Sequence, residues 1–372
     1  MTVQVAEKRT TNGYVVGFLT LDRPEVLHAL SFEMMQTISS QILQWKDRKD
    51  VVAVVLASST ERAFCAGGDI REMYQQVKSL PKEEAKAFAE NYFAVEYGLE
   101  YELHRYPKPI IAWGGGIVMG GGWGLFAGAS HRIITETSRM AMPEVHIGLY
   151  PDAGGSWFLS RLPGNLGKFL ALTGTSIFPR DIMRLGIADY CLANRQKDVC
   201  LTDLLSLPWS DNSTSNHDLI TLLMNDLAAV ESFELPDANI FPVRQAISRA
   251  LHAKQVTKAV SALLTLKGMT PWLDAALTQL SKGSPLSQHL AFAMQEKAKH
   301  ASLADSFRLE WWVSVNCCLY PDYSEGVRAL LIDRDGEPKW QASSLAGVST
   351  EVLDQFLNPD FSNINHPLMN LN

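Results

Sequence analysis

Residues 109–129, PIIAWGGGIVMGGGWGLFAGA, form the stretch that decides the fold, because they combine an uncharged apolar run with many glycines. The stretch is long enough for a membrane-spanning helix, which needs about 20 apolar residues. Eight of its residues are glycines, however, and each glycine costs a helix interior roughly 0.8–1.0 kcal/mol relative to alanine. The sequence therefore predicts a buried strand over residues 110–113, a glycine-lined turn, and a helix that begins near Gly121.

A turn of this kind brings backbone N–H groups without shielding side chains, and the positive end of a helix, to one place. Such a place suits an anion, or an oxygen that becomes negative during a reaction. Close packing of backbone against backbone explains the same glycines. The stretch alone leaves both interpretations open.

A second junction of the same type is predicted in AFCAGGDIREM, residues 63–73. Gly67 and Gly68 permit a tight turn, and Asp69 is placed to cap the helix that follows. Two such junctions in one α/β layer can face each other and offer two N–H groups to a single oxygen.

The N-terminal segments read as an α/β unit. Residues 14–21 and 51–57 have the pattern of strands, and Ser31 is placed to cap an amphipathic helix that ends near Trp45. The second strand is a continuous β-branched run, which is typical of a strand covered on both faces. Further along, the pattern predicts a long helix over residues 82–104 and short strands over 132–135 and 139–142.

From about Lys197 onward the strand-like runs stop and helical patterns follow one another. They cover residues 219–230, 243–251, 256–264, 272–280, 285–300 and 302–319. The polar stretch 210–218 is expected to be an exposed connection. We therefore expect an α/β region over residues 1–196, which holds the functional site, and an all-helical region over residues 197–372.

Two carboxylates stand out in PEVHIGLYPDAGGSW, residues 143–157. Glu144 and Asp152 lie among apolar residues, where a carboxylate is costly unless it is paired or hydrogen-bonded, so the two mark a candidate active site. Each also has a structural interpretation: Glu144 in the first turn of a helix, and Asp152 as the cap of the next one. His146 is expected to be a hydrogen-bonded structural histidine.

Composition excludes several classes of protein. The 372 residues are 47% hydrophobic and 20% charged, as in an ordinary globular protein that can bury a large core. The net charge of −7 and the lack of a basic cluster speak against a nucleic-acid partner. The five cysteines include no CxxC pair, and the nine histidines have no metal-ligand spacing, so no metal site is expected. The start has no apolar signal-peptide core, which predicts a cytoplasmic protein without membrane association.

Three motifs in order carry a family resemblance: AFCAGGDI (63–70), GIVMGGGWGL (116–125) and AMPEVHIGLYPDAGG (141–155). With LDRPEVLHAL (21–30), they resemble the crotonase, or enoyl-CoA hydratase/isomerase, superfamily. The resemblance implies a spiral of ββα units followed by helices, with an oxyanion hole for an acyl-CoA thioester. Carried onto this sequence, the oxyanion donors are the N–H groups of Gly68 and Gly121.

Within the superfamily the chain looks most like the 3-hydroxyisobutyryl-CoA hydrolases, through MPEVHIGLYPDAGGSWFLSRL (142–162) and EGVRALLIDRDGEPKW (325–340). This resemblance places the catalytic carboxylates on Glu144 and Asp152 and a substrate-contacting glutamate on Glu96. His28 departs from the asparagine that the family usually has there. Hydratases of the superfamily carry a second glutamate three residues after the oxyanion glycine, and that position here is Gly124.

The resemblance thus implies hydrolysis of a short branched 3-hydroxyacyl-CoA thioester, as in valine breakdown. An acyl-CoA is the expected partner, and no cofactor is required because CoA is part of the substrate; a homo-oligomer is compatible with the sequence. Glu144 serves either as a nucleophile or as a general base, and the sequence does not choose between them. An enoyl-CoA hydratase or isomerase is the alternative, and a non-catalytic CoA-binding protein is a third hypothesis.

Overall fold

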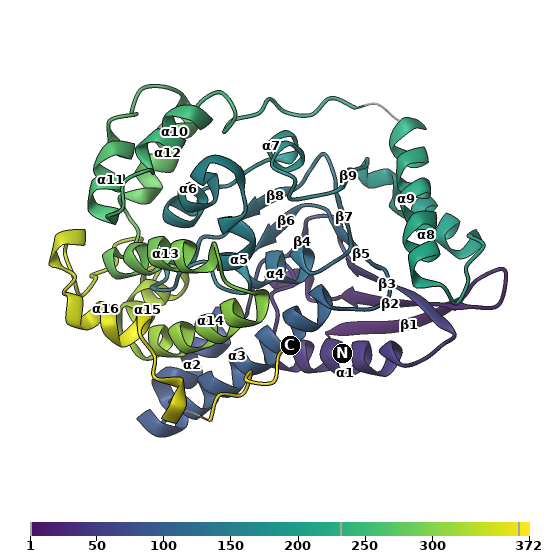
Figure 1. The fold of residues 1–372 in the computed structure, drawn as a ribbon, viewed down its shortest axis with the longest axis horizontal. Helices are drawn as coiled ribbons and strands as arrows, with labels where there is room; N and C mark the ends of the chain where they lie inside the picture. The colour runs from purple at the N-terminus through teal and green to yellow at the C-terminus, as the bar shows by residue number, and fades with distance from the viewer. Residues whose placement is uncertain (1, 231–232, 364) are drawn as a thin grey trace. The chain divides into compact units, whose positions relative to one another are not determined.

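The computed structural model describes residues 2–230, 233–363 and 365–372 (Figure 1). The chain forms two compact units, each built from separate stretches of sequence. Unit 1 comprises Met1–Gly68, Glu102–Met140 and Ile177–Ala238, and unit 2 comprises Asp69–Tyr101, Ala141–Ser176 and Asn239–Asn372. The expected division of the chain at residue 196 stays a prediction.

Unit 1 is organised around a six-stranded sheet. In spatial order its strands are β1 (Val3–Arg9), β2 (Val15–Leu21), β3 (Val51–Ser58), β5 (Ile110–Gly114), β7 (His131–Ile134) and β9 (Tyr190–Cys191). The β1 strand pairs with β2 antiparallel, and the other neighbours are parallel. The strands predicted at 14–21 and 51–57 are confirmed, whereas β1 was not predicted.

Helices pack their apolar side chains against the six-stranded sheet. Helix α1 (Phe32–Lys46) begins after Ser31, whose hydroxyl accepts the N–H of Met34, so this predicted cap is confirmed. Gly17 of β2 makes room for the α1 side chain of Trp45, because a Cβ there would lie 2.7 Å from the indole ring. The short helix α7 (Pro179–Arg184) also belongs to unit 1.

Two further helices, α8 (Lys197–Ser206) and α9 (Ser213–Val230), lie beside the sheet (Figure 1) and bury Leu204 and Met224 in one apolar cluster with Val55. The interpretation of residues 210–218 as a connection is wrong from Ser213 onward. The side chain of Asn212 accepts the N–H of Ser215 and so stabilises the start of α9.

A second, three-stranded sheet contains β4 (Ala63–Cys65), β6 (Ile117–Met119) and β8 (Arg139–Ala141). The β6 strand lies inside the glycine-rich stretch and was not predicted there. It is followed by the short helix α4 (Gly121–Ala127), which starts where the sequence predicted.

Unit 2 is mainly helical. Its N-terminal part holds α2 (Ile70–Ser79), capped by Asp69 as predicted, and most of the long helix α3 (Lys82–His104). The remaining helices are α5 (Gly155–Ser160), α6 (Leu166–Thr173), α10 (Arg244–Ala250), α11 (Val256–Leu264), α12 (Pro271–Leu280), α13 (Pro285–Ala298), α14 (Leu303–Leu319), α15 (Pro321–Val327) and α16 (Thr350–Leu357). The helical region expected after residue 197 is confirmed. None of the described helices combines the length and apolarity needed to cross a bilayer.

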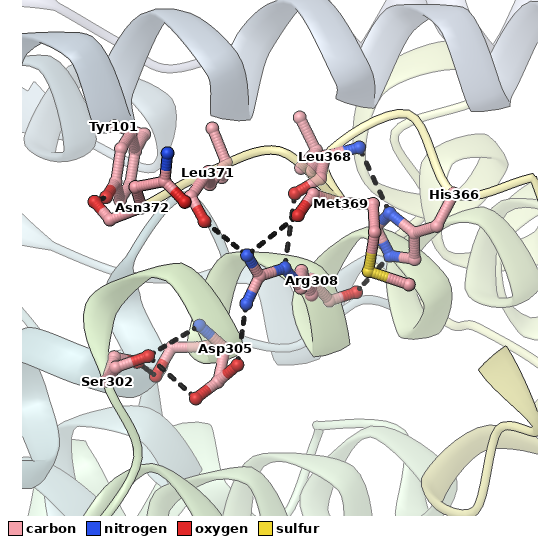
Figure 2. A network of polar contacts seen from close by, with 10 residues as sticks. Tyr101, Ser302, Asp305, Arg308, His366, Leu368, Met369, Leu371 and Asn372 are labelled. Carbon is pink, nitrogen blue, oxygen red and sulfur yellow. Dashed lines mark hydrogen bonds and ion pairs between the residues drawn. The ribbon is translucent and has the colours of Figure 1, made fainter. Parts of the chain in front are cut away.

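Arg308 of α14 fastens the segment 366–372 onto unit 2 (Figure 2). Its guanidinium donates to three main-chain carbonyls of that segment, those of Leu368, Met369 and Leu371. The hydroxyl of Tyr101, on α3, donates to the main-chain oxygen of Asn372. Side chains of α14 and α3 therefore bind the main-chain oxygens of this segment.

Candidate active site

The two glycine junctions of unit 1 lie against each other. Strands β4 and β6 are parallel neighbours, so the turns that follow them leave the same edge of the small sheet. Gly67 has a φ of +105°, which favours glycine, and a Cβ there would lie 3.1 Å from the Met119 oxygen and 3.6 Å from the Gly121 nitrogen. A Cβ on Gly122 would lie 2.5 Å from the Cys65 oxygen. The close packing of backbone against backbone is therefore confirmed, and the junctions meet; the binding of an anion or oxyanion there stays a prediction.

Gly68 lies just before Asp69, the cap of α2, and Gly121 lies just after Gly120, the residue that precedes α4. Gly68 forms a parallel bridge with Leu30, whose N–H donates to the Gly67 carbonyl at 2.8 Å. Gly121 is the first residue of α4, so its N–H has no acceptor within its own helix. The structure thus brings both glycines predicted from the sequence to one edge of unit 1.

His28 belongs to the loop beside the first junction, with its side chain fully buried. Its φ of +57° lies in the left-handed region, which asparagine and histidine tolerate better than most residues. Its Nδ1 accepts the N–H of Arg23 at 3.0 Å, which leaves Nε2 to donate to the Thr60 hydroxyl at 2.8 Å. The departure from asparagine therefore preserves the backbone shape of this loop.

Glu144 lies in unit 2, at the start of a 3-10 helix over Glu144–His146. The side chain is 6% exposed, and its Oε2 has no hydrogen-bond partner among the described residues. Burial, followed by the charges of Asp152 and Glu96, holds the pKa of Glu144 well above its usual range. A carboxylate of this kind is a strong base once it has lost its proton.

Asp152 is equally buried but is hydrogen-bonded. Its Oδ2 lies 2.5 Å from the hydroxyl of Tyr97 and 3.5 Å from that of Ser314. Burial raises the pKa of Asp152 to about 6, although the hydrogen bond from Tyr97 favours the charged form. The interpretation of Asp152 as a helix cap is wrong, since α5 begins at Gly155 after Gly154, which has a left-handed backbone.

Glu96 and Glu100 project from α3 one turn apart, and both are buried. Burial and then the charge of Asp152 raise the pKa of Glu96 well above its usual range; for Glu100 burial acts first, followed by Glu96. Neither carboxyl oxygen of Glu100 has a partner among the described residues, as suits a neutral acid. Glu96, Glu144 and Asp152 thus form one electrostatic group, and Glu100, which was not predicted from the sequence, joins it.

Replacing Glu100 by glutamine should flatten the pH dependence of stability. Above the carboxyl's unfolded pKa of about 4.3, the native protein keeps a proton that the unfolded chain loses, so stability falls as pH rises. The loss reaches about 1.4 kcal/mol per pH unit until the native pKa is passed. Thermal unfolding should therefore give matching midpoints for wild type and Glu100→Gln at pH 4, and a higher midpoint for the variant at pH 8.

The control is Glu84→Gln, on the exposed first turn of the same helix. It should leave the pH dependence unchanged. A Glu100→Gln protein whose midpoint follows that of wild type at both pH values would contradict a protonated Glu100.

His146 has a structural role, and the possible metal-ligating side chains do not form a cluster. His146 contacts the Thr173 carbonyl through Nε2 at 3.1 Å, as expected of a structural histidine. Within the ranges that the structure describes, no cluster of three or more His, Cys, Asp or Glu side chains is arranged to hold a metal ion.

Comparison with known proteins supports the resemblance. The family model described as enoyl-CoA hydratase/isomerase matches residues 16–357. The mitochondrial 3-hydroxyisobutyryl-CoA hydrolase of Danio rerio is 38% identical over 344 residues, which cover 91% of this chain and 86% of the relative.

Two solved structures are similar over nearly the whole chain. A carnitinyl-CoA dehydratase from Mycobacterium thermoresistibile has a TM-score of 0.81 at 31% identity, with 96% of each chain covered. An enoyl-CoA hydratase from Rhodobacter sphaeroides has a TM-score of 0.79 at 31% identity, with 95% of this chain and 97% of the other covered. The chain therefore belongs to the enoyl-CoA hydratase/isomerase, or crotonase, family.

Proposed function

We propose that this protein hydrolyses a short branched 3-hydroxyacyl-CoA thioester, of the 3-hydroxyisobutyryl-CoA type, to the free acid and CoA. The observation that carries the proposal is the pair of buried carboxyls Glu144 and Asp152, of which one has an unpartnered oxygen and the other is held by a hydroxyl. The hydrolase relative from Danio rerio supports the substrate class.

The roles follow from the chemistry of the groups. The N–H groups of Gly68 and Gly121 stabilise the oxyanion that forms when the thioester carbonyl is attacked. Glu144 either attacks the carbonyl carbon, giving an anhydride that water then opens, or takes a proton from the attacking water. In both routes water is added, the C–S bond breaks and the thiolate of CoA leaves. Asp152 orients Glu144, the water or the substrate hydroxyl, and Glu96 contacts the substrate.

The second candidate is an enoyl-CoA hydratase, which the similarity to the Rhodobacter sphaeroides structure favours. Hydration needs an acid and a base that act together on water and the alkene. The position at which hydratases carry their second glutamate is Gly124, in the first turn of α4, and it has no side chain to offer. Hydrolysis is therefore the better match to the residues present.

A panel of short acyl-CoAs tests the proposal. Free thiol release should be fastest with 3-hydroxyisobutyryl-CoA, slower with the unbranched 3-hydroxy compound, and slowest with the saturated acyl-CoA that lacks the hydroxyl. A panel without thiol release would exclude hydrolysis. Equal rates across the panel would exclude recognition of the hydroxyl.

Asp152→Asn should fold normally and lower kcat by about 10²-fold, the usual scale for a group that assists proton transfer. Asparagine retains an oxygen that can accept the Tyr97 hydroxyl, but it carries no charge and takes up no proton. Steady-state kinetics with a thiol-trapping reagent measure the effect. An unchanged kcat would assign Asp152 a purely structural role.

A further inference from the structure

A chain of hydroxyl groups ends on Asp152. The Tyr97 hydroxyl, from α3, lies 2.5 Å from Asp152 Oδ2 and 2.7 Å from the Ser314 hydroxyl of α14. Both hydroxyls meet the same carboxylate oxygen, and all three side chains are buried. Three separate segments of unit 2 therefore converge on one oxygen.

The number of hydroxyl hydrogens fixes which group donates to which along this row of hydroxyl groups. An ionised carboxylate only accepts, and a tyrosine has one hydroxyl hydrogen, so Tyr97 donates to Asp152. The Ser314 hydroxyl is then free to donate to the Tyr97 oxygen. Ser314 also lies 3.1 Å from the Tyr150 hydroxyl, which donates to the Glu310 carbonyl at 3.0 Å. The hydroxyls of Tyr97, Ser314 and Tyr150 thus each have an acceptor when Asp152 is charged.

Helix α14 also holds the loop that follows Asp152. The carboxylate of Glu310, one turn before Ser314, accepts the N–H groups of Gly154 at 2.8 Å and Ser156 at 2.9 Å. The α14 helix therefore fixes both the main chain after Asp152 and the hydroxyls that bind its side chain.

We propose that Tyr97 and Ser314 are positioning residues for the reaction: Tyr97 holds Asp152 by Oδ2, Ser314 holds the Tyr97 hydroxyl, and together they fix the direction of the carboxylate. This inference rests on the proposed function. Asp152 differs in this respect from Glu144 and Glu100, which have buried oxygens without partners. The hydrogen bonds also lower the pKa of Asp152 against the effect of burial.

The carboxyl groups that surround Asp152, with a raised pKa in each case, are Glu96, Glu100, Glu144 and Glu310. The buried Tyr150 and Tyr323 hydroxyls and the Cys317 and Cys318 thiols also face it and have raised pKa values.

Tyr97→Phe and Ser314→Ala test the proposal, each beside a matched control. Tyr101→Phe removes a hydroxyl from the same helix, one turn on, where it contacts Asn372 (Figure 2). Ser287→Ala removes a buried serine hydroxyl that has no partner among the described residues.

Tyr97→Phe should lower kcat by about 10-fold, the scale of one hydrogen bond to a charged group, with KM little changed. The acidic limb of its pH–kcat profile, to which Asp152 contributes beside Glu144, should move to higher pH, because loss of a donor to the charged form raises the pKa of Asp152. Ser314→Ala should move the limb in the same direction by a smaller amount, and the controls should leave it in place. Equal losses in Tyr97→Phe and Tyr101→Phe, with the limb unmoved, would overturn the proposal. Ser314→Ala decides the question if Tyr97→Phe fails to fold.

A carboxyl ¹³C NMR titration of the ligand-free protein separates this inference from the proposed function. If thioester hydrolysis is absent in wild type, the proposed function fails, yet the Asp152 titration still reports on the hydroxyl chain. A higher pKa of Asp152 in Tyr97→Phe supports the role of the hydroxyl groups, and an unchanged pKa refutes it.

Discussion

Glu144→Gln is expected to abolish measurable thioester hydrolysis while the protein stays folded. Glutamine preserves the size of the side chain but is neither a carboxylate nucleophile nor an effective base. Loss of a general base alone costs about 10²–10⁴-fold in rate. Because burial and nearby charge already favour the neutral form of Glu144, an uncharged amide should fit the same place without loss of stability.

Thermal unfolding and thiol trapping on the same preparation separate these effects. In the wild-type enzyme, the raised pKa of Glu144 predicts that the rate falls as pH drops through that pKa, because the ionised form is lost. Full hydrolase activity in a folded Glu144→Gln variant would exclude Glu144 from the chemistry.

Gly121→Val should lower kcat/KM by about 10²–10³-fold, the usual cost of one lost oxyanion donor. The branched side chain stands beside the N–H that the acyl oxygen must approach, at the start of α4. Its effect should be visible in turnover and in binding of a non-hydrolysable acyl-CoA analogue.

Gly347→Val is a matched control, because its Cβ would meet nothing closer than 3.6 Å. It should retain wild-type rates. Near-normal turnover in a folded Gly121→Val protein would place the oxyanion hole elsewhere.

Local signals in the sequence predicted much of the fold. Helix α3 has the predicted bounds, and Ser31 and Asp69 cap the helices that follow them, as predicted. Strand β1 was missed because its side chains are exposed from Gln4 onward, so it has no apolar pattern. Strand β6 was missed because it is three residues long and flanked by glycines.

Some residues of the candidate site could likewise be predicted from local sequence, and others could not. Glu144 and Asp152 could be selected because each is a carboxylate in an apolar segment. The contact between Tyr97 and Ser314 joins residues 217 positions apart, and no local pattern marks such a pair. Glu100 had a readable signal, since it lies one helical turn after Glu96 on a buried face. The assigned roles, the cytoplasmic location and the oligomeric state stay predictions.

Hydrolysis and hydration are distinguished by following 3-hydroxyisobutyryl-CoA and a short enoyl-CoA side by side, with one enzyme preparation. Thiol trapping reports cleavage of the first, and loss of the enoyl thioester absorbance reports hydration of the second. A hydrolase should show rapid thiol release that depends on Glu144, with hydration at background. Robust hydration without thiol release would contradict the proposed hydrolysis.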